Sequence, residues 1–331
     1  MRKCCFIIPY FGTMPNYFKL FLKSCATNPS FYWLIVTDDR TDYHYPNNVK
    51  TYYMSFEQLQ ALVQSKFDFP ISLKFPYKLC DYKPAYGFIF EEEIKEYSYW
   101  GHCDLDTIMG DLSKFLTDEL LSKYDKLFCL GHMTIYRNTP ENNRVFMSSF
   151  KGKKVYQDIY SQNQNFWFDE EYHDEYNVNR IFLDCNKRVY TKDLSLNFYI
   201  KSTAFRRVKY VGVSDNCNEH GYLCEPLKPY LCVWKNGKIL RYLLENGALK
   251  SEEYMYVHLQ GRKFNSGSKV LASNIFKILP NKFLPLEVAN VTASNFNQVK
   301  KRIICLHFWQ CQWKSKKLHI NRWINKYYRH E

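Results

Sequence analysis

Residues 99–106 read Tyr-Trp-Gly-His-Cys-Asp-Leu-Asp, an aromatic run that ends in two carboxylates two positions apart. The run predicts a buried strand over Tyr97–Cys103. Because side chains alternate along a strand, Asp104 and Asp106 can share one side only near an extended end or a turn. Two carboxylate oxygens at such an end can hold a divalent cation, Mn²⁺ or Mg²⁺, that still has room for a phosphate. The pair therefore predicts metal-assisted departure of a diphosphate, and a simple helix cap is the alternative.

The rest of the N-terminal half alternates strand and helix signals. Strands are predicted at Cys4–Pro9, Phe31–Thr37 and Val49–Met54, and helices at Asn16–Cys25, from a cap at Ser55 through Gln64, and at Tyr86–Glu96. This alternation predicts an α/β fold with a mostly parallel, doubly wound sheet. Ligands of such sheets bind beyond the carboxyl ends of the strands.

Two more predicted strand ends carry residues that suit a nucleotide, so three strand ends on one rim form a candidate pocket. Pro9, Tyr10 and Phe11 follow the first strand, and the two rings can stack on a base or belong to the core. Asp38 and Asp39 follow the second strand, where an acid can bind ribose hydroxyls or the base. An ordinary Asx turn is the alternative for these two acids.

A late histidine is the candidate third metal ligand. His258 lies in a predicted strand, Tyr254–Leu259, and Gly261, Arg262 and Lys263 follow it. An imidazole can complete the coordination of Mn²⁺, and the two nearby cations can hold the diphosphate as its charge develops. A satisfied core histidine is the alternative.

Lys83 opens the helix that precedes the Asp104–Asp106 strand. Pro84 suits the first position of a helix, which places Lys83 at the positive helix start. An anion can bind there, so Lys83 is a candidate nucleotide-sugar contact. A solvated lysine is the alternative.

The middle of the chain, roughly 138–193, is polar and aromatic with weak periodicity. This composition predicts loops and short helices, which would form the wall of the pocket that faces the acceptor of the transferred group. Asp169 and Glu170 belong to an acidic cluster there, and one of them can act as general base on an acceptor hydroxyl. A solvated acidic loop is the alternative. His132 and Asn138 are candidates for binding sugar hydroxyls, because nearby aromatic residues suit the face of a pyranose.

Composition limits the class of protein. The 331 residues are 46% hydrophobic, which suits one large domain or two intimate ones. No run of about 18 apolar residues occurs, and the N-terminus is better explained by a buried strand than by a signal peptide. The twelve cysteines are scattered without zinc spacing, so we expect reduced thiols in a cytosolic protein. The net charge of +13 predicts an anionic partner.

The tail differs from the rest of the chain. Residues 298–331 are basic, and apolar residues recur at spacings of three and four, which predicts one or two amphipathic helices. Such a segment can lie on an anionic membrane, and a helix packed on the domain is the alternative. We therefore expect a domain over 1–297, with a nucleotide-binding half at about 1–135 and an acceptor-side half at about 136–297, followed by the tail.

Taken together, these motifs resemble glycosyltransferases of the GT-A type, in particular bacterial enzymes that build capsule and lipopolysaccharide O-antigen chains. The motifs are Ile-Ile-Pro-Tyr-Phe-Gly near the start, Val36-Thr-Asp-Asp, Asp81-Tyr-Lys-Pro-Ala-Tyr-Gly87, Trp100-Gly-His-Cys-Asp-Leu-Asp106, Gly131-His through Asn138, and Val257-His-Leu-Gln-Gly-Arg-Lys263. The resemblance implies a Rossmann-like GT-A fold, with Mn²⁺ and the diphosphate held by Asp106 and His258, and with Asp104 on the ribose or the metal.

The resemblance also implies a reaction and a location. A hexose would move from a UDP-sugar onto a glycan or a polyprenyl-diphosphate-linked acceptor, in a cytoplasmic enzyme peripheral to the inner face of the plasma membrane. Two other classes remain open. The charge and the aromatic content suit a nucleotidyltransferase or a nucleic-acid-binding protein. Against nucleic-acid binding, the basic residues concentrate in the tail and no nucleic-acid-binding motif occurs, so we expect no nucleic-acid partner. A catalytically inert, membrane-associated scaffold is the third class.

Overall fold

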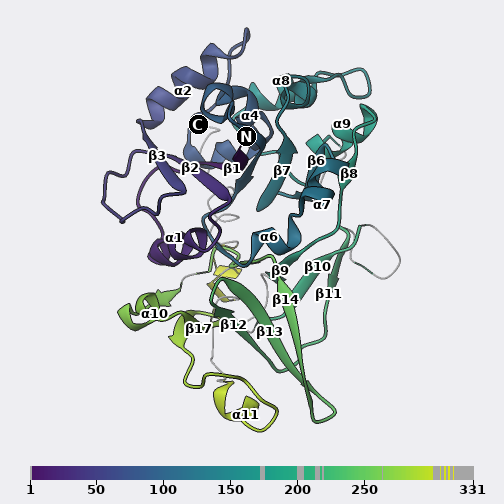
Figure 1. Ribbon diagram of the computed structural model, residues 1–331. Helices are drawn as coiled ribbons and strands as arrows, with labels where there is room; N and C mark the ends of the chain where they lie inside the picture. The colour runs from purple at the N-terminus through teal and green to yellow at the C-terminus, as the bar shows by residue number, and fades with distance from the viewer. Residues whose placement is uncertain are drawn as a thin grey trace.

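A computed structural model of the protein describes residues 2–171, 176–199, 205–212, 217, 220–262, 264–300, 306, 309, 310, 312, 313 and 316. These residues form a mixed α/β structure with three sheets (Figure 1). The first sheet and most helices occupy the upper part of Figure 1, and the antiparallel strands of the C-terminal half occupy the lower part. The α/β class is as predicted, but the strands form three mixed sheets instead of one mostly parallel sheet.

The first sheet has the strand order β3-β2-β1-β4-β7-β6-β8. Its strands are β1 (Arg2–Pro9), β2 (Phe31–Thr37), β3 (Val49–Tyr53), β4 (Tyr97–Cys103), β6 (Lys126–Leu130), β7 (Met133–Arg137) and β8 (Val189–Tyr190). The first four run parallel, and β7 is antiparallel to both β4 and β6. Apolar clusters cover both faces, which is why the parallel strands read as continuous apolar runs. The carboxyl ends of β2, β1 and β4 therefore share one rim, as predicted.

The helices agree with the sequence where it carries clear end signals. Helix α1 spans Phe18–Ala26, and α2 spans Phe56–Ser65 behind a capping box made by Ser55 and Gln58. The helix predicted over 86–96 is broken into α4 (Tyr86–Ile89) and α5 (Glu91–Ile94). The remaining short helices are η1 (Pro76–Lys78), α3 (Leu79–Tyr82), η2 (Lys83–Ala85), α6 (Leu112–Phe115), α7 (Asp118–Lys123), η3 (Asn142–Met147), α8 (Val155–Tyr160), α9 (Val178–Asp184), α10 (Ser268–Ala272) and α11 (Phe296–Val299). No helix in the described part of the chain is both long and apolar enough to cross a membrane.

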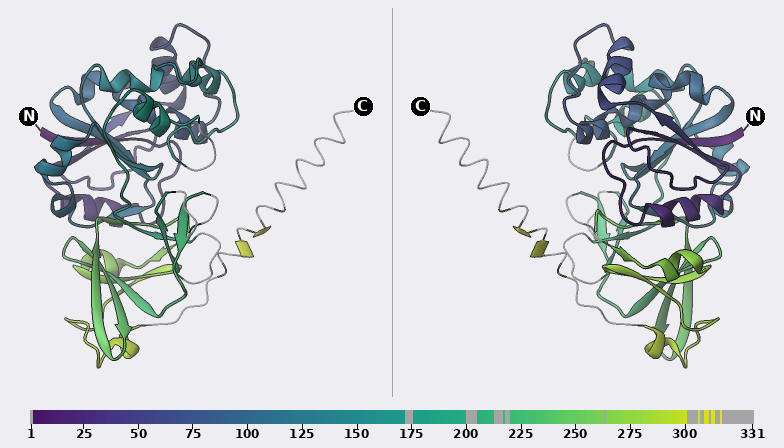
Figure 2. Two further views of the ribbon diagram at one scale, coloured as in Figure 1. Left: turned by 90° about the vertical axis from the view of Figure 1, so that its right-hand side faces the viewer. Right: turned by 90° about the vertical axis from the view of Figure 1, so that its left-hand side faces the viewer.

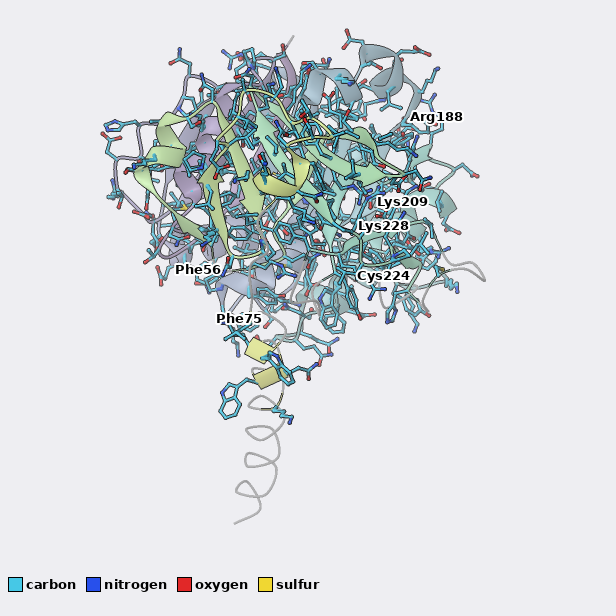
Figure 3. The ribbon with its side chains drawn as sticks, turned by 90° about the horizontal axis from the view of Figure 1, so that it is seen from below. Phe56, Phe75, Arg188, Lys209, Cys224 and Lys228 are labelled. Carbon is cyan, nitrogen blue, oxygen red and sulfur yellow. The ribbon has the colours of Figure 1, made fainter. Side chains whose placement is uncertain are left out.

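The second sheet has the order β11-β10-β9-β15-β5 and lies against the carboxyl rim of the first sheet (Figure 2). Its strands are β5 (Thr107–Met109), β9 (Ser195–Phe198), β10 (Arg207–Tyr210), β11 (Tyr222–Cys224) and β15 (Tyr256–His258). Viewed from below, Lys209 and Cys224 of the β10–β11 pair lie at one edge of the molecule, away from Phe56 on α2 (Figure 3).

The third sheet, β14-β13-β12-β17-β18-β16, is built mainly from hairpins. Its strands are β12 (Tyr230–Lys235), β13 (Lys238–Glu245), β14 (Ala248–Tyr254), β16 (Asn265–Ser266), β17 (Ile275–Leu279) and β18 (Lys282–Pro285). Two Asn-Gly turns connect the first three strands, and all four turn residues have positive φ. Paired positive φ values define the turn whose twist matches antiparallel strands, so these dipeptides were a usable sequence signal for the hairpins.

The predicted boundary between domain and tail falls inside packed structure. Phe296 and Val299 of α11 are buried against Leu231 and Val233 of β12, and the Lys277 ammonium donates to the Val299 carbonyl. Most of the predicted tail lies outside the described residues. None of the cysteines in the described ranges forms a disulfide.

A buried ion pair fixes the chain beside the candidate pocket. The Lys78 ammonium lies 2.8 Å from an Asp81 carboxylate oxygen, and both side chains are 0% exposed. Lys78 also donates to the carbonyls of Ile159 and Gln164, and Asp81 accepts from backbone amides of the segment that follows residue 164. This pair therefore joins η1 and α3 to α8 and to the segment that follows residue 164.

Asp81→Ala is expected to lower the free energy of unfolding by about 3–5 kcal/mol, because it leaves a buried ammonium without its partner. Urea denaturation followed by circular dichroism measures the loss. Glu92→Ala, which breaks an ion pair with Lys95 between two mostly exposed side chains, is the matched control and should change little. Equal losses in the two variants would contradict the role given to the buried pair.

Candidate functional site

The three predicted metal ligands lie together because two strands from different halves of the chain pair with each other. Strand β4 ends at Cys103, and the chain turns through Asp104 and Asp106 into β5. Strand β5 pairs antiparallel with β15, with Thr107 opposite His258. The Leu259 amide also donates to the Asp106 carbonyl at 2.7 Å, which extends the pairing past the strand.

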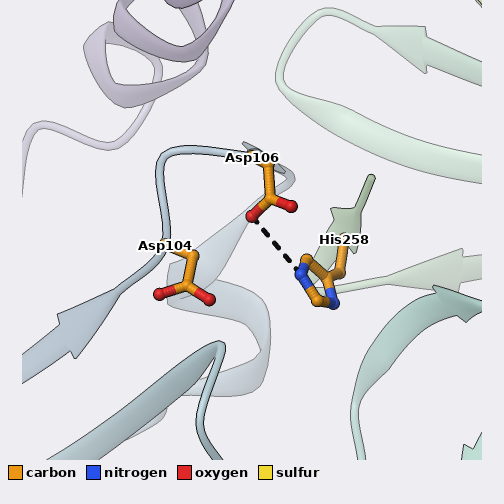
Figure 4. Close-up of side chains that lie close together, drawn as sticks. All are labelled: Asp104, Asp106 and His258. Atoms are coloured by element: carbon orange, nitrogen blue, oxygen red, sulfur yellow. Dashed lines mark ion pairs between the residues drawn. The ribbon is translucent and has the colours of Figure 1, made fainter. Parts of the chain in front are cut away.

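The side chains of Asp104, Asp106 and His258 offer ligand atoms that all lie within 4.8 Å of one another (Figure 4). His258 Nε2 is 3.3 Å from an Asp106 oxygen. Burial alone would raise the pKa of the Asp106 carboxyl, but the neighbouring imidazole holds that pKa below its usual range. Burial alone would lower the pKa of His258, and the Asp106 charge raises it instead. A cluster in which two carboxylates face an imidazole is the donor set of a divalent cation such as Mn²⁺.

Contacts outside the cluster orient its members. His258 Nδ1 lies 3.2 Å from the Asn197 amide oxygen, and this contact leaves Nε2 directed at Asp106. The Gly261 amide donates to the other Asp106 oxygen at 2.5 Å. Such supporting contacts are typical of metal ligands, because they fix the ring and the carboxylate before the ion binds.

A cavity of about 520 Å³ opens beside the cluster. Besides the three ligands, its lining includes Lys83, His132, Trp167, Asp169, Glu170 and Gln260. The lining mixes carboxylates, amides and aromatic rings, so the cavity suits a polar ligand that also carries an apolar face.

Lys83 is buried at this cavity, so the alternative of a solvated lysine is wrong. Its ammonium lies 2.9 Å from an Asp104 oxygen and 3.1 Å from an Asp169 oxygen, and it donates to the Gly131 carbonyl at 2.8 Å. Burial would lower the pKa of Lys83, but the two carboxylates raise it well above the usual value. Lys83 therefore stays charged and balances two acids at the cavity wall.

Asp169 and Glu170 also lie in the cavity wall and not on a solvated loop. Burial raises the pKa of Asp169, although Lys83 opposes the rise. Burial, together with the neighbouring Asp169 charge, raises the pKa of Glu170 to about 7. A Glu170 oxygen accepts from the Gly131 amide at 3.2 Å. Glu170 is thus a carboxyl group whose pKa lies in the range of a general base.

His132 reaches the same cavity from the turn between β6 and β7. Its Nδ1 lies 2.7 Å from the Tyr256 hydroxyl, and its ring centre lies 4.3 Å from that of His258. Burial, and then the nearby His258, lowers the pKa of His132 well below its usual value. A neutral imidazole at this place can exchange a hydrogen bond with a bound hydroxyl.

The predicted nucleotide contacts lie along the neighbouring part of the rim. Pro9 ends β1, and Tyr10 is half-buried close enough to Asp106 that the carboxylate charge adds to the effect of burial in raising the tyrosine pKa. Phe11 packs on Phe56 with ring centres 5.3 Å apart, so it belongs at least partly to the core.

The two acids after β2 differ from each other. Asp38 is exposed and accepts from the Gly12 amide at 2.8 Å, so it remains available at the rim. Asp39 accepts from the Thr41 amide and from the Tyr43 hydroxyl, both at 2.9 Å. The first of these contacts is an Asx turn, so the alternative interpretation holds for Asp39.

Asn138 is not brought to the site. It follows β7, which runs antiparallel to β4, so it lies beside Ser98 at the opposite end of β4 from Asp104. Its amide donates to the carbonyls of Ile94 and Tyr97. Its predicted contact with sugar hydroxyls is therefore wrong, and it has a structural role.

Arg262 is also buried away from the cavity lining. It is 1% exposed, donates to the Tyr199 carbonyl at 3.2 Å and lies over the Phe205 ring. It therefore supports the wall of the site and does not reach a diphosphate in this conformation. Lys263 lies outside the described residues.

Sequence reasoning missed several residues of the cavity. Asn197 and Gln260 contact each other at 2.5 Å beside His258, and Tyr77, Trp167 and Tyr199 supply aromatic walls. Asn197 is placed by the parallel pairing of β9 with β15, and no local sequence pattern indicates this register. Only the aromatic richness around residue 167 hinted at this wall.

Comparison with known families gives one match. The sequence profile of a family of unknown function (DUF6625) matches residues 6–287, and the chain belongs to this family. The matched region contains the whole Asp104–Asp106–His258 cluster and the cavity beside it. A comparison with curated proteins finds no match to this chain.

The raised pKa of Glu170 predicts a pH dependence of stability. The folded protein keeps a proton on Glu170 up to about pH 7, whereas an unfolded glutamate releases it near pH 4.5. The free energy of unfolding contributed by this group therefore falls between pH 4.5 and pH 7 and is constant above. Urea denaturation at pH 5 and pH 7.5 should show a smaller fall for Glu170→Gln than for the wild-type protein. The same fall in both proteins would mean that Glu170 titrates normally.

Proposed function

We propose that this protein is a metal-dependent glycosyltransferase of the GT-A type that moves a hexose from a UDP-sugar onto a glycan or a lipid-linked oligosaccharide. The observation that carries the proposal is the Asp104–Asp106–His258 cluster at the carboxyl rim of the parallel strands. A sugar diphosphate needs a cation at such a place, because its leaving group must be neutralised.

The order of residues along the rim supports a nucleotide donor. Asp38, Tyr10 and Asp104 directly follow the carboxyl ends of the neighbouring strands β2, β1 and β4 respectively. In doubly wound sheets this crevice holds nucleotides, with a strand-end acid on the ribose. Asp38 is the exposed acid in the position to do so, and Tyr10 offers a ring beside it.

The residues of the chain divide the chemistry between them. Mn²⁺ or Mg²⁺ held by Asp104, Asp106 and His258 would neutralise the departing diphosphate. Asn197 keeps His258 oriented, and Lys83 keeps Asp104 in place. Glu170, with a pKa of about 7, can accept the proton of an acceptor hydroxyl as that oxygen attacks the anomeric carbon. In this assignment Asp169 is a positioning residue, because it is tied to Lys83.

The proposal extends to location. We propose that the protein binds the inner face of the plasma membrane through its basic C-terminal segment, where lipid-linked acceptors are found. Leu306, Trp309 and Trp313 are 58%, 64% and 74% exposed, and lysines and arginines surround them in the sequence. Exposed tryptophans next to basic residues suit the interface of an anionic membrane.

Mn²⁺ alone, without a nucleotide sugar, should bind to the Asp104–Asp106–His258 cluster. Saturating Mn²⁺ at about 100 times its Kd should stabilise the wild-type fold by about 2.7 kcal/mol and raise its Tm accordingly. His258→Ala should lose this rise, because one of three ligands is gone. His44→Ala removes an exposed histidine after β2 and is the matched control. An equal rise in all three proteins would place the ion elsewhere.

Turnover of a UDP-sugar should depend on the same cluster. UDP release from a panel of UDP-sugars should require Mn²⁺, should favour one donor, and should fall at least about a hundredfold in Asp106→Asn. Asp158→Asn, at an exposed carboxylate on α8, is the matched control and should keep full activity.

Three outcomes would contradict the proposed function. Release of pyrophosphate from nucleoside triphosphates would indicate a nucleotidyltransferase. Turnover that is unchanged in Asp106→Asn would separate the activity from the cluster. Failure of every donor to bind, with or without Mn²⁺, would favour an inert scaffold.

A further inference from the structure

Trp167 adopts a backbone conformation that a bulky residue rarely takes. Its φ is 54°, in the left-handed region, where a tryptophan pays a conformational cost. The side chain is 41% exposed and lines the cavity beside the metal cluster. A strained residue with an exposed large ring at a cavity suggests that the ring is held there for a ligand.

The backbone on both sides of Trp167 is held by one buried carboxylate. Asp81 accepts from the Phe166 amide at 3.1 Å and from the Phe168 amide at 3.2 Å. Lys78 pairs with Asp81 at 2.8 Å and donates to the Gln164 carbonyl at 2.6 Å. Because the Lys78 and Asp81 side chains are buried and charged, these bonds are charge-assisted and can offset the conformational cost at Trp167.

The same ion pair places a second exposed ring at the cavity. Tyr77 precedes Lys78 in η1, so the lysine enters the core while the tyrosine, 66% exposed, lines the cavity. The Asn165 amide also lies 3.5 Å from the Tyr77 carbonyl, which joins the two segments again. The backbone segments that carry these two aromatic residues are thus joined to each other through one ion pair.

Trp167 lies on the side of the metal cluster that we assign to the acceptor. Along the rim, Asp38 after β2 comes first, then Tyr10 after β1, and then Asp104 after β4. The segment of Trp167 contacts the next part of the rim, because Glu170 binds the Gly131 amide and the Glu171 amide donates to Cys129. Trp167 therefore lies on the side of the metal cluster that is opposite to the predicted nucleotide contacts.

The surroundings of the rings define the chemistry of the ligand. Glu170, Gln260 and Asn197 line the same cavity and offer carboxylate and amide groups. A pyranose has an apolar face that stacks on an aromatic ring and a rim of hydroxyls that bind such polar groups. A lipid chain would leave these polar groups unpaired at a cost in free energy.

We propose that Trp167 and Tyr77 form a preorganised subsite that binds a pyranose ring of a neutral acceptor glycan by stacking. The subsite rests on the proposed function, since it names the acceptor class of the same site. It assigns specificity for the acceptor glycan to two residues outside the metal cluster. The held backbone of both segments favours affinity, because little backbone freedom is lost on binding.

Direct binding tests the subsite without requiring turnover. The probes are neutral trisaccharides of glucose, galactose and N-acetylglucosamine, titrated into the full-length protein with saturation-transfer NMR as readout. Trp167→Gly is the informative variant, because glycine accepts the same positive φ and leaves the loop in place. It should weaken the best-binding trisaccharide about tenfold, and Trp167→Phe should recover part of the loss.

Two controls make the result interpretable. Tyr52→Ala removes a 41% exposed ring from β3 and should leave glycan binding unchanged. The Mn²⁺-dependent rise in Tm should persist in Trp167→Gly, which would show that the fold and the cluster are intact. If the wild-type protein binds trisaccharides but no UDP-sugar binds with or without Mn²⁺, the proposed function fails while the glycan subsite stands.

The subsite would be overturned by any of three results. No trisaccharide binds the wild-type protein, binding is equally strong in Trp167→Gly, or dodecylphosphocholine binds in a Trp167-dependent manner while no glycan does. The last result would assign the rings to a lipid headgroup.

Discussion

The pairing of β5 with β15 is the interaction on which the site depends. It joins the turn that carries Asp104 and Asp106, at the carboxyl rim of the first sheet, to the strand that carries His258, from the C-terminal half. Without this pairing the two carboxylates would face solvent at the end of β4, with no imidazole beside them. The contacts of Leu259 and Gly261 with Asp106 extend the same connection beyond the strand, so the cluster is built at a junction between two sheets.

Charge balance around the cavity follows from one lysine. Asp104 and Asp169 are close enough to share the Lys83 ammonium, and Glu170 lies next to Asp169. A buried cation between two acids offsets part of their repulsion. Burial still raises the pKa of Asp169, and burial together with the Asp169 charge raises the pKa of Glu170 to about 7. Glu170, with a pKa of about 7, is therefore the carboxyl group of this wall that can move a proton near neutral pH.

The sequence was informative where local pattern and tertiary structure agree. Strands β2 and β4 have the predicted bounds, because apolar runs between turn signals leave little freedom. Ser55 begins α2 as predicted, because its capping box is a local interaction. The shared rim of β1, β2 and β4 followed from parallel order alone.

Other features depend on contacts that local pattern does not contain. Asn138 was misplaced because β7 runs antiparallel to β4, a direction that the sequence does not reveal. The burial of Lys83 depends on acids far from it along the chain. The hairpins of the third sheet were within reach, since the Asn-Gly pairs at 236–237 and 246–247 are local turn signals. The left-handed conformation of Trp167 could not be predicted from local pattern, because the neighbouring amides are held by tertiary hydrogen bonds to Asp81.

The most direct test of the account is anomalous diffraction at the manganese edge from crystals of the protein grown with Mn²⁺ and UDP. We expect one strong peak bounded by Asp104, Asp106 and His258, with the UDP diphosphate against it and the base toward Tyr10 and Asp38. A fully occupied peak elsewhere, or UDP bound at full occupancy with no manganese at the cluster, would contradict it.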